Sequence, residues 1–560
     1  MVTPGQPSRR AAAAPLARRL LAALHRDLGG LRAAAASLLA VRPGLFAYDV
    51  HPPGGTRRIH LRIEPDGSGL LLVDVSDAIH LSPTAALLAR LALDRTPRQR
   101  ALAVLRSRFH GVDSARLGGE AERIYALVGH LATTTDACPT CGLEGLARTP
   151  LFSTPVRAPY KADLALSYRC NNACPHCYNP RERAAMPSLP LAAWRRVLAR
   201  LARVGVPHVI FTGGEPTLVD GLPELIRRAG RLGLVSGVNT NGRRLSDPRF
   251  VQSLARAGLD HVQITLESCR PEVHNAMTGA ASFAETVRGI ENSLAAGLHT
   301  ITNTTLTRRN VDHAELLVEF LHSLGLRTFA MNGMICSGGG RGGKREGGRG
   351  KGEGGNDHSA RWALNAGDPD CLSQDMLPSP RLRGEGPGVR GSGTGSESGP
   401  SSSLPPSPFS PPSSPFSLRP SSEALAPVLV AVRERAAELG MRFLWYTPTA
   451  YCRLSPLELE LGPRRCNAGE YSICVEPNGD VLPCQSYYTP AGNILCDPWE
   501  RIWNSRLFRS FRERVADPRR CGLPEQCWDC PDLSLCAGGC RLERENSKLE
   551  IENWKLKIEN

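Results

Sequence analysis

The sequence predicts an α/β fold that follows a small α+β domain and precedes a cysteine-rich domain. Three observations support this prediction. Strand and helix patterns alternate over residues 160–336, strand and helix patterns also fill residues 47–135, and ten of the 18 cysteines follow residue 450. Regular alternation of strands and helices is typical of a parallel sheet or barrel. A chain of 560 residues is long enough for three or four domains.

The composition predicts a cytoplasmic protein without a membrane span. Hydrophobic residues make up 41% of the chain, yet no apolar run approaches the roughly 20 residues that a membrane-spanning helix needs. Near the N-terminus, Arg18, Arg19, His25 and Arg26 interrupt every apolar stretch, which argues against a secretion signal. In a cytosolic enzyme, closely spaced thiols indicate metal ligands before disulfides.

Residues 1–46 form an Ala/Arg-rich N-terminal segment with seven arginines and one acid, Asp27, so they supply +6 of the net charge of +14. Two interpretations are open, a basic helical arm that contacts an anionic surface and a plain solvated helix. No aromatic residues alternate with the arginines, so base stacking has no support and nucleic acid is not an expected partner.

Residues 47–135 contain strand and helix patterns of a small domain. The runs RIHLRIEPDG and SGLLLVDVS predict two strands joined by a Pro-Asp-Gly turn. The run LSPTAALLARLAL predicts a helix with Ser82 as N-cap and Pro83 in its first position. Further helices are expected near residues 97–108 and 118–133.

Residues 160–336 alternate between strand and helix patterns. Six strands are expected, and each except the last is followed directly by an amphipathic helix. The strands lie in DLALSYRC, HVIFTGGEP, VSGVNTNG, HVQITLES, TITNTTLT and RTFAMNGMI.

A long low-complexity insertion interrupts this alternation at residues 337–421. Its Gly-, Pro- and Ser-rich runs cannot bury enough apolar surface to fold. The pattern resumes at residues 422–449, which are expected to supply the last helix and strand of the core. Parts of the insertion and the tail at 542–560 look like translated bacterial interspersed repeats, and an evolved linker is the alternative.

The stretch CNNACPHCYNP places Cys170, Cys174 and Cys177 directly after the first strand of the core. The spacing would fit one face of a helix, but Pro175 and two asparagines make a loop the better interpretation. Three thiolates fit a 4Fe–4S cluster with one open iron, since full ligation takes four cysteines. A zinc site with His176 as fourth ligand is the alternative.

This motif resembles that of the radical S-adenosylmethionine superfamily, because an aromatic residue, Tyr178, follows the last cysteine. Other landmarks of the superfamily appear in its order at the ends of later strands, over residues 162–335. These are FTGGEP, NTNG, ITLES, TNTTLT and NGMI.

The resemblance implies a partial (β/α)6 TIM-like barrel with its site at the carboxyl ends of the strands. It also implies that Cys170, Cys174 and Cys177 hold a 4Fe–4S cluster whose open iron binds S-adenosyl-L-methionine. One-electron reduction of this cofactor, supplied by a flavodoxin- or ferredoxin-type donor, would give a 5′-deoxyadenosyl radical that abstracts hydrogen from the substrate. Residues expected near the cofactor are Gly213, Gly214, Glu215, Pro216, Asn239, Thr265, Asn303 and Thr305.

The sequence suggests what some of these residues contribute. The two glycines allow close backbone approach to a ligand, and the Glu215 carboxylate suits the methionine ammonium group. An ordinary strand-to-loop turn is the alternative for GGEP taken alone. Asn303 and Thr305 are suited to contact the ribose or, equally, to fill the barrel. No catalytic residue is assigned.

Residues 450–541 resemble the SPASM auxiliary-cluster domain of peptide-modifying members of the superfamily. Cys466 is followed by Gly479 and Cys484, and CWDCPDLSLCAGGC has the spacing C-x2-C-x5-C-x3-C. The resemblance implies one or two auxiliary 4Fe–4S clusters. The first would use Cys466, Cys484 and Cys540, with Cys452 as fourth ligand and Cys474 as the next choice.

The second auxiliary cluster would use Cys527, Cys530 and Cys536. A last cysteine that the pattern requires beyond Cys540 is absent from the sequence. Three explanations are open: Cys521 substitutes for it, the cluster keeps an open iron, or the site is lost. A zinc ribbon is the alternative for CWDC with CAGGC.

Residues 47–135 also resemble the leader-peptide-recognition domain named for pyrroloquinoline quinone biosynthesis, and a structural appendage is the alternative. Together the resemblances imply radical modification of a ribosomally made peptide or protein. A tetrapyrrole substrate and a non-enzymatic zinc- or cluster-binding module are the alternatives. Six cysteines receive no role: Cys138, Cys141, Cys269, Cys336, Cys371 and Cys496.

Overall fold

A computed structural model of the chain divides into two compact units, residues 1–149 and 150–560. It describes residues 43–51, 57–73, 77–109, 113–133, 157–335, 337 and 418–544. The basic N-terminal segment, most of the low-complexity insertion, the repeat-like tail beyond residue 544, and the cysteines at positions 138, 141, 336 and 371 lie outside these residues. No helix of the described ranges is long and apolar enough to cross a membrane.

The first unit contains a four-stranded antiparallel sheet with the order β1-β2-β3-β4. Its strands are β1 (Gly44–Val50), β2 (Arg57–Ile63), β3 (Gly69–Val73) and β4 (Asp77–Leu81). The predicted hairpin is confirmed: β2 and β3 are joined by a turn in which Gly67 has a φ of +84°. The sequence did not predict β1 and β4, which form the two outer strands.

Three helices follow the sheet: α2 (Pro83–Leu93), α3 (Arg98–Arg108) and α4 (Ser114–Thr133). The predicted N-cap is confirmed, because the Ser82 hydroxyl accepts a hydrogen bond from the Ala85 amide at 3.2 Å. Helix α4 begins four residues earlier than predicted, since the Asp113 carboxylate accepts from the Arg116 amide at 3.1 Å and caps it.

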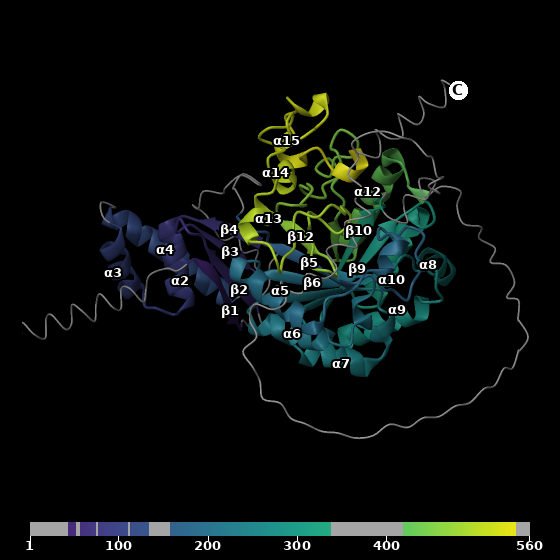
Figure 1. The fold of residues 1–560 in the computed structure, drawn as a ribbon, viewed down its shortest axis with the longest axis horizontal. Coiled ribbons are helices and arrows are strands. Elements are labelled where there is room, and N and C mark those ends of the chain that lie inside the picture. Colours follow the sequence, from purple (N-terminus) through teal and green to yellow (C-terminus); the bar gives the residue numbers. More distant parts are fainter. Residues whose placement is uncertain are drawn as a thin grey trace, which may run out of the picture. The chain divides into compact units, whose positions relative to one another are not determined.

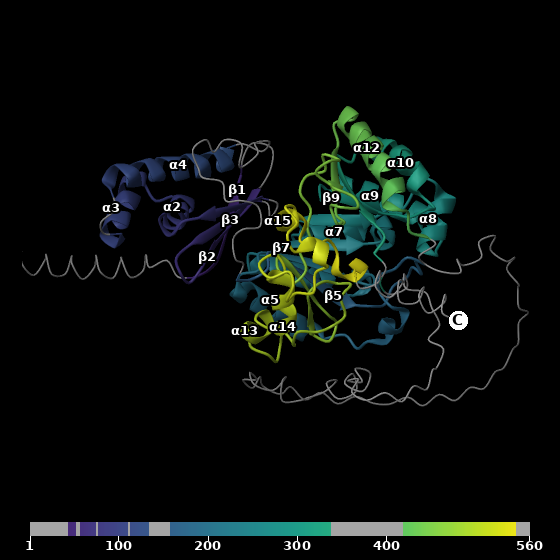
Figure 2. The same ribbon diagram turned by 90° about the horizontal axis from the view of Figure 1, so that it is seen from above.

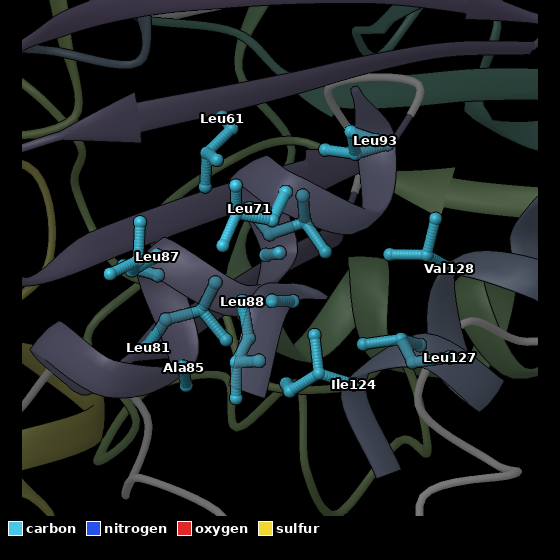
Figure 3. Packing of buried hydrophobic residues seen from close by; sticks show 14 of the residues in the cluster. Leu61, Leu71, Leu81, Ala85, Leu87, Leu88, Leu93, Ile124, Leu127 and Val128 are labelled. Carbon is cyan, nitrogen blue, oxygen red and sulfur yellow. The ribbon is translucent and has the colours of Figure 1, made fainter. Parts of the chain in front are cut away.

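The core of this unit lies between the sheet and its helices (Figure 3). Leu61 and Leu71 project from the sheet, Leu88 comes from α2 and Ile124 from α4, and all four are fully buried. Burial of such side chains contributes about 2 kcal/mol each. The unit therefore has a hydrophobic core of its own.

The second unit is built on a nine-stranded sheet with the order β11-β10-β9-β8-β7-β6-β5-β12-β13. All neighbouring strands are parallel except β12 and β13. The six predicted strands are confirmed as β5 (Lys161–Ser167), β6 (His208–Gly213), β7 (Val235–Thr240), β8 (His261–Thr265), β9 (His299–Leu306) and β10 (Thr328–Gly333).

The connecting helices lie outside this curved sheet (Figures 1 and 2), as in a partial barrel. They are α5 (Leu191–Val204), α6 (Leu222–Arg231), α7 (Pro248–Arg256), α8 (Pro271–Thr278), α9 (Phe283–Ala295) and α10 (Ala314–Ser323). The alternation continues with α12 (Ser422–Glu438) and β11 (Arg442–Trp445), which pairs with β10.

The C-terminal segment extends the sheet at its opposite edge. Strand β12 (Ser472–Val475) pairs with β5, and β13 (Val481–Leu482) completes a hairpin with it. Short helices α13 (Trp499–Trp503), α14 (Arg506–Arg512) and α15 (Leu533–Cys536) follow, separated by turns. The sequence did not predict that this segment covers the β5 edge.

Candidate functional site

The three closely spaced cysteines lie in a loop that begins directly after β5, as predicted. Cys177 donates a backbone hydrogen bond to the Cys174 carbonyl at 3.2 Å, which closes a tight turn between these two residues. Cys170 is exposed, while Cys174 and Cys177 are half-buried, and none of the three forms a disulfide. The loop therefore presents three free thiols at the carboxyl end of the parallel sheet.

The asparagines of this loop fix its first half. The Asn241 amide, in the turn after β7, donates to the Asn171 side-chain oxygen at 2.7 Å. Arg243 donates to the Asn171 carbonyl and, at 3.3 Å, to the Asn172 side chain. These bonds explain the residues between Cys170 and Cys174, because they hold the loop against the end of β7. The Asn172 amide also donates to the Cys170 sulfur at 3.4 Å.

Backbone contacts fix the loop at two further points. The Ala173 amide donates to the Thr278 carbonyl at the end of α8, at 2.9 Å. The next residue, Gly279, has a φ of +64°, and a Cβ there would lie 2.5 Å from the Ala173 carbonyl oxygen. Only glycine therefore allows the two segments to approach so closely. On the other side, the Asn179 amide donates to the Gly213 carbonyl at 2.8 Å.

His176, which lies between the second and third cysteines, is bound by Glu267 at the end of β8. Its Nε2 atom is 3.0 Å from one oxygen of the Glu267 carboxylate, and the other oxygen accepts from the Thr305 amide at 2.8 Å. Both side chains are almost completely buried. Glu267 thus holds His176 in place, a role that the sequence did not reveal.

The two glycines of FTGGEP permit close approach to the chain itself. A Cβ on Gly213 would lie 2.2 Å from the Ser167 carbonyl oxygen, and one on Gly214 would lie 2.3 Å from the Arg169 carbonyl oxygen. The Gly214 amide also donates to the Ser167 carbonyl at 2.7 Å. These residues hold β6 against the start of the cysteine loop, and the ligand contact expected from the sequence stays a prediction.

Glu215 joins the ends of β6 and β7. One carboxylate oxygen accepts from the hydroxyls of Thr217 and Thr240 at 2.6 and 2.7 Å, and the other accepts from the Asn241 amide at 2.8 Å. Burial raises the pKa of this carboxyl, while the hydrogen bonds lower it. The carboxylate is thus engaged with the protein, and Pro216 is buried at the start of a short 3-10 helix beside it.

The remaining predicted cofactor contacts share one half-exposed face of the sheet. Asn239 on β7, Thr265 on β8, and Asn303 and Thr305 on β9 alternate with buried neighbours. Thr265 and Asn303 pair directly across β8 and β9. The Asn303 side-chain oxygen is buried without a hydrogen-bond partner. An unpartnered buried acceptor on this face suits a polar ligand with hydroxyl or amino donors, such as S-adenosylmethionine.

The thiols of the loop also suit a cationic cluster. Desolvation at the sulfur raises the pKa of Cys170, Cys174 and Cys177, and the Cys177 sulfur raises the pKa of Cys170 and Cys174 further. Bound iron would balance the charge of the three thiolates. As the side chains stand, no set of three or more Cys, His, Asp or Glu residues in the described ranges is at metal-binding distances.

The C-terminal cysteines fall into two groups. Cys466 and Cys540 are buried and Cys484 is half-buried, and both Cys484 and Cys540 are influenced electrostatically by Cys466. Burial raises the pKa of Cys484 to about 12 and that of Cys540 well above its ordinary value. The structure thus brings together the three cysteines predicted for a first auxiliary cluster.

The second group consists of Cys527, Cys530 and Cys536, with Cys452 close by. Burial raises the pKa of the Cys527 thiol, and the sulfurs of Cys536, Cys452 and Cys530 raise it further. Cys452, which was expected at the first cluster, therefore lies within electrostatic range of the second group.

Three other cysteines occupy different surroundings. Cys474, the next choice for the first cluster, is fully buried on β12 and packs against Ala165, Tyr168 and Leu482. It also lies within electrostatic range of Cys484. Cys521 is half-buried in a turn. Cys269, after β8, is half-buried and receives no role.

A buried polar joint connects the cysteine loop to the C-terminal segment. Arg183, just after the loop, forms an ion pair with Glu476 at the end of β12. The Tyr168 hydroxyl donates to the same carboxylate at 2.7 Å, and the Arg183 guanidinium lies 4.2 Å from the Tyr488 ring centre. No sequence pattern indicated this joint, because its members are about 300 residues apart in the chain.

Two stretches of the chain match known domain families. Residues 164–321 match the Radical SAM superfamily, and residues 466–531 match the iron–sulfur cluster-binding SPASM domain. Both matches fall within the segments whose motifs predicted these domains. The first match falls on the parallel sheet. The second includes Cys466, Cys484, Cys527 and Cys530 and ends before Cys536 and Cys540.

Characterised proteins also resemble the chain over most of its length. The PqqA peptide cyclase of Xanthomonas campestris pv. campestris (strain 8004) is 27% identical over 405 residues, covering 69% of this chain and 83% of the relative. The PqqA peptide cyclase of Streptomyces rochei is 26% identical over 394 residues, covering 69% and 86%. The crystal structure of Streptococcus suis SuiB bound to the precursor peptide SuiA has the same fold, with a TM-score of 0.54, 14% identity, and coverage of 87% and 94%.

Proposed function

We propose that this chain, a radical S-adenosylmethionine enzyme with a SPASM domain, modifies a ribosomally made peptide. The observation that carries the proposal is the similarity to two PqqA peptide cyclases, which extends over more than four fifths of each relative. These relatives favour a peptide over a tetrapyrrole. The fold shared with SuiB bound to its precursor peptide is consistent with the same class of substrate.

The residues at the carboxyl end of the sheet supply binding, orientation and exclusion of water. Cys170, Cys174 and Cys177 would hold the 4Fe–4S cluster. When bound, this cluster provides the electron that cleaves S-adenosylmethionine to a 5′-deoxyadenosyl radical. Asn303 and Thr265 would contact the cofactor from the sheet. Glu267 and His176 would keep the loop in place during turnover.

The first unit is proposed to bind the leader part of the peptide. Within its described residues, β1 and β4 are the outer strands of the sheet, and each pairs with one neighbour. An extended peptide can add to such an edge through backbone hydrogen bonds. We further propose a reduced flavodoxin- or ferredoxin-type protein as electron donor, and the cytoplasm as the place where both meet the enzyme.

Anaerobic reconstitution tests the proposal. The probe is a synthetic copy of a short peptide encoded beside the gene, with S-adenosylmethionine and dithionite. We expect the peptide to increase 5′-deoxyadenosine formation and to change mass, and Cys174→Ala to abolish both. Hydrogen exchange should show protection of β1 or β4 on peptide binding. Stimulation by a tetrapyrrole and not by the peptide would refute the proposal.

A further inference from the structure

The Cys527–Cys536 group lacks the fourth cysteine that the domain pattern places downstream. No cysteine follows Cys540 in the sequence. A 4Fe–4S cluster with four protein ligands takes four cysteines. Three explanations were open from the sequence: a substitution by Cys521, a cluster with an open iron, or loss of the second site. The described cysteines near this group offer another candidate for a fourth thiol.

The segment that precedes Cys452 is packed directly against this group. The Tyr451 amide donates to the Cys536 sulfur at 3.4 Å, and the Cys536 thiol lies 3.9 Å from the Thr449 carbonyl oxygen. Gly539 lies in close contact with the same segment, since a Cβ there would lie 2.8 Å from the Ala450 nitrogen. An amide hydrogen bond to a sulfur is a common means of stabilising a cluster-bound thiolate.

The turn that carries Cys452 leaves its side chain available. The Arg453 and Leu454 amides both donate to the Ala450 carbonyl, at 2.8 and 3.0 Å, so that Cys452 lies in a compact turn. Cys452 is exposed and forms no disulfide. Its neighbour in space is the Cys527 thiol, as the electrostatics of that residue showed.

The rival cysteine has different surroundings. The Cys521 amide donates to the Asp517 carbonyl at 3.1 Å, which holds it in the turn after α14. Its strongest electrostatic neighbours are the acids Glu513 and Asp517 and the cations Arg520 and Arg514, so it lies among charged side chains of this turn.

We propose that Cys452 is the fourth ligand of a cluster held by Cys527, Cys530 and Cys536. Cys452 lies 75 positions before Cys527 in the chain. The first auxiliary group then keeps Cys466, Cys484 and Cys540, with Cys474 within electrostatic range of Cys484. This proposal does not depend on the nature of the substrate.

Iron content tests the proposal in the full chain. Replacing all three loop cysteines by alanine removes the S-adenosylmethionine site and leaves about eight irons in two auxiliary clusters. In this background we expect Cys452→Ala to lose between one and four irons and to alter the electron paramagnetic resonance signal of one reduced cluster. Cys521→Ala is the matched control and should change neither the iron and sulfide content nor the spectrum.

Two further backgrounds identify which cluster Cys452 serves. When Cys466, Cys484 and Cys540 are also replaced, only the second group remains, and Cys452→Ala should remove or convert its cluster. When Cys527, Cys530 and Cys536 are replaced instead, Cys452→Ala should have no effect. The reverse pattern would place Cys452 at the first cluster and overturn the proposal, as would full iron retention in every background.

A second variant distinguishes loss of a ligand from misfolding. Cys452→Asp keeps an anionic side chain and should retain the second cluster with a shifted reduction potential. Circular dichroism of the iron-free chains should be unchanged, because Cys452 is exposed. Retention of iron with an unshifted potential in Cys452→Asp would show that the residue is not a ligand.

Discussion

The cysteine loop after β5 and the C-terminal cysteine groups reach the same kind of donor set by different routes. The loop takes its three thiols from eight consecutive residues, 170–177, and surrounding strand ends hold those residues in place. The C-terminal groups collect their thiols from residues 452–540, in a segment dominated by turns and short helices. The first site is local in sequence and braced from outside, and the second is assembled from distant parts of the chain.

The two sites are therefore stabilised by different kinds of contact. Glu267, Asn241 and Arg243 hold the loop through side chains that contact residues beside the cysteines. The C-terminal groups depend on packing of the segment against itself, as at Tyr451 and Cys536. Changes in the barrel should therefore affect the loop site first, and changes at the joint between the regions should affect both.

The largest effect is expected from breaking the joint. Arg183→Met leaves the Glu476 carboxylate buried without its partner, which should lower the free energy of unfolding by about 3–5 kcal/mol. The loss can be measured by denaturant unfolding, followed by tryptophan fluorescence. All seven tryptophans lie at or beyond residue 194, so this signal reports on the second unit alone.

The double variant Arg183→Met/Glu476→Gln tests whether the unpaired buried charge causes this loss of stability. With the charge removed on both sides, most of the lost stability should return, because an uncompensated buried charge is the main cost. A loss below about 1 kcal/mol in Arg183→Met would mean that the joint contributes no more than a surface ion pair. The two cysteine regions would then be held together by the β5–β12 pairing.

The same comparison explains what the sequence could predict. The loop site was predictable because its ligands, its asparagines and the glycines of FTGGEP lie within short motifs. Glu267 belonged to the quoted ITLES motif, but its partner His176 is 91 residues away. The Arg183–Glu476 joint and the position of Cys452 depend on how β12 and the 449–452 turn pack, which no local pattern encodes. Strands β12 and β13 were missed because they contain only four and two residues.

Acid should weaken the loop side of the molecule. His274 accepts a hydrogen bond from the Glu267 amide at 3.2 Å, and burial lowers its pKa from 6.5 to about 4. The folded protein therefore keeps this imidazole neutral, whereas the unfolded chain binds a proton below pH 6.5. Its contribution to stability is complete above pH 6.5 and is lost as the pH falls toward 4, a total of about 3 kcal/mol.

The measurement compares urea unfolding at pH 7 and pH 5 for wild type and His274→Asn. Burial also lowers the pKa of His261 on β8 to about 4, so some acid sensitivity should remain in the variant. We expect the variant to lose less stability than wild type between these two pH values, by about 2 kcal/mol. Equal losses in both proteins would contradict the role of His274.

A smaller effect is expected from removing the Glu267 carboxylate, which contacts His176 and the Thr305 amide. Glu267→Ala frees His176 and the Thr305 amide, and a misplaced supporting residue typically lowers metal affinity or activity by about 10–100-fold. The readouts are the rate of 5′-deoxyadenosine formation per cluster and the rate of iron loss to a chelator. Glu224→Ala, which removes an exposed ion pair with Arg195, is the matched control and should change neither.

The smallest effect is expected at Cys474, and it distinguishes a core cysteine from a ligand. This residue is fully buried on β12 against Ala165, Tyr168 and Leu482, so its sulfur fills space in the core. Cys474→Ala should cost about 1 kcal/mol of stability and leave the iron content unchanged. Cys484→Ala, ten positions later in the chain, should instead lose iron from the first auxiliary group. Iron loss in Cys474→Ala would return that residue to the ligand set and show that the first cluster draws its fourth thiol from the edge of the barrel sheet.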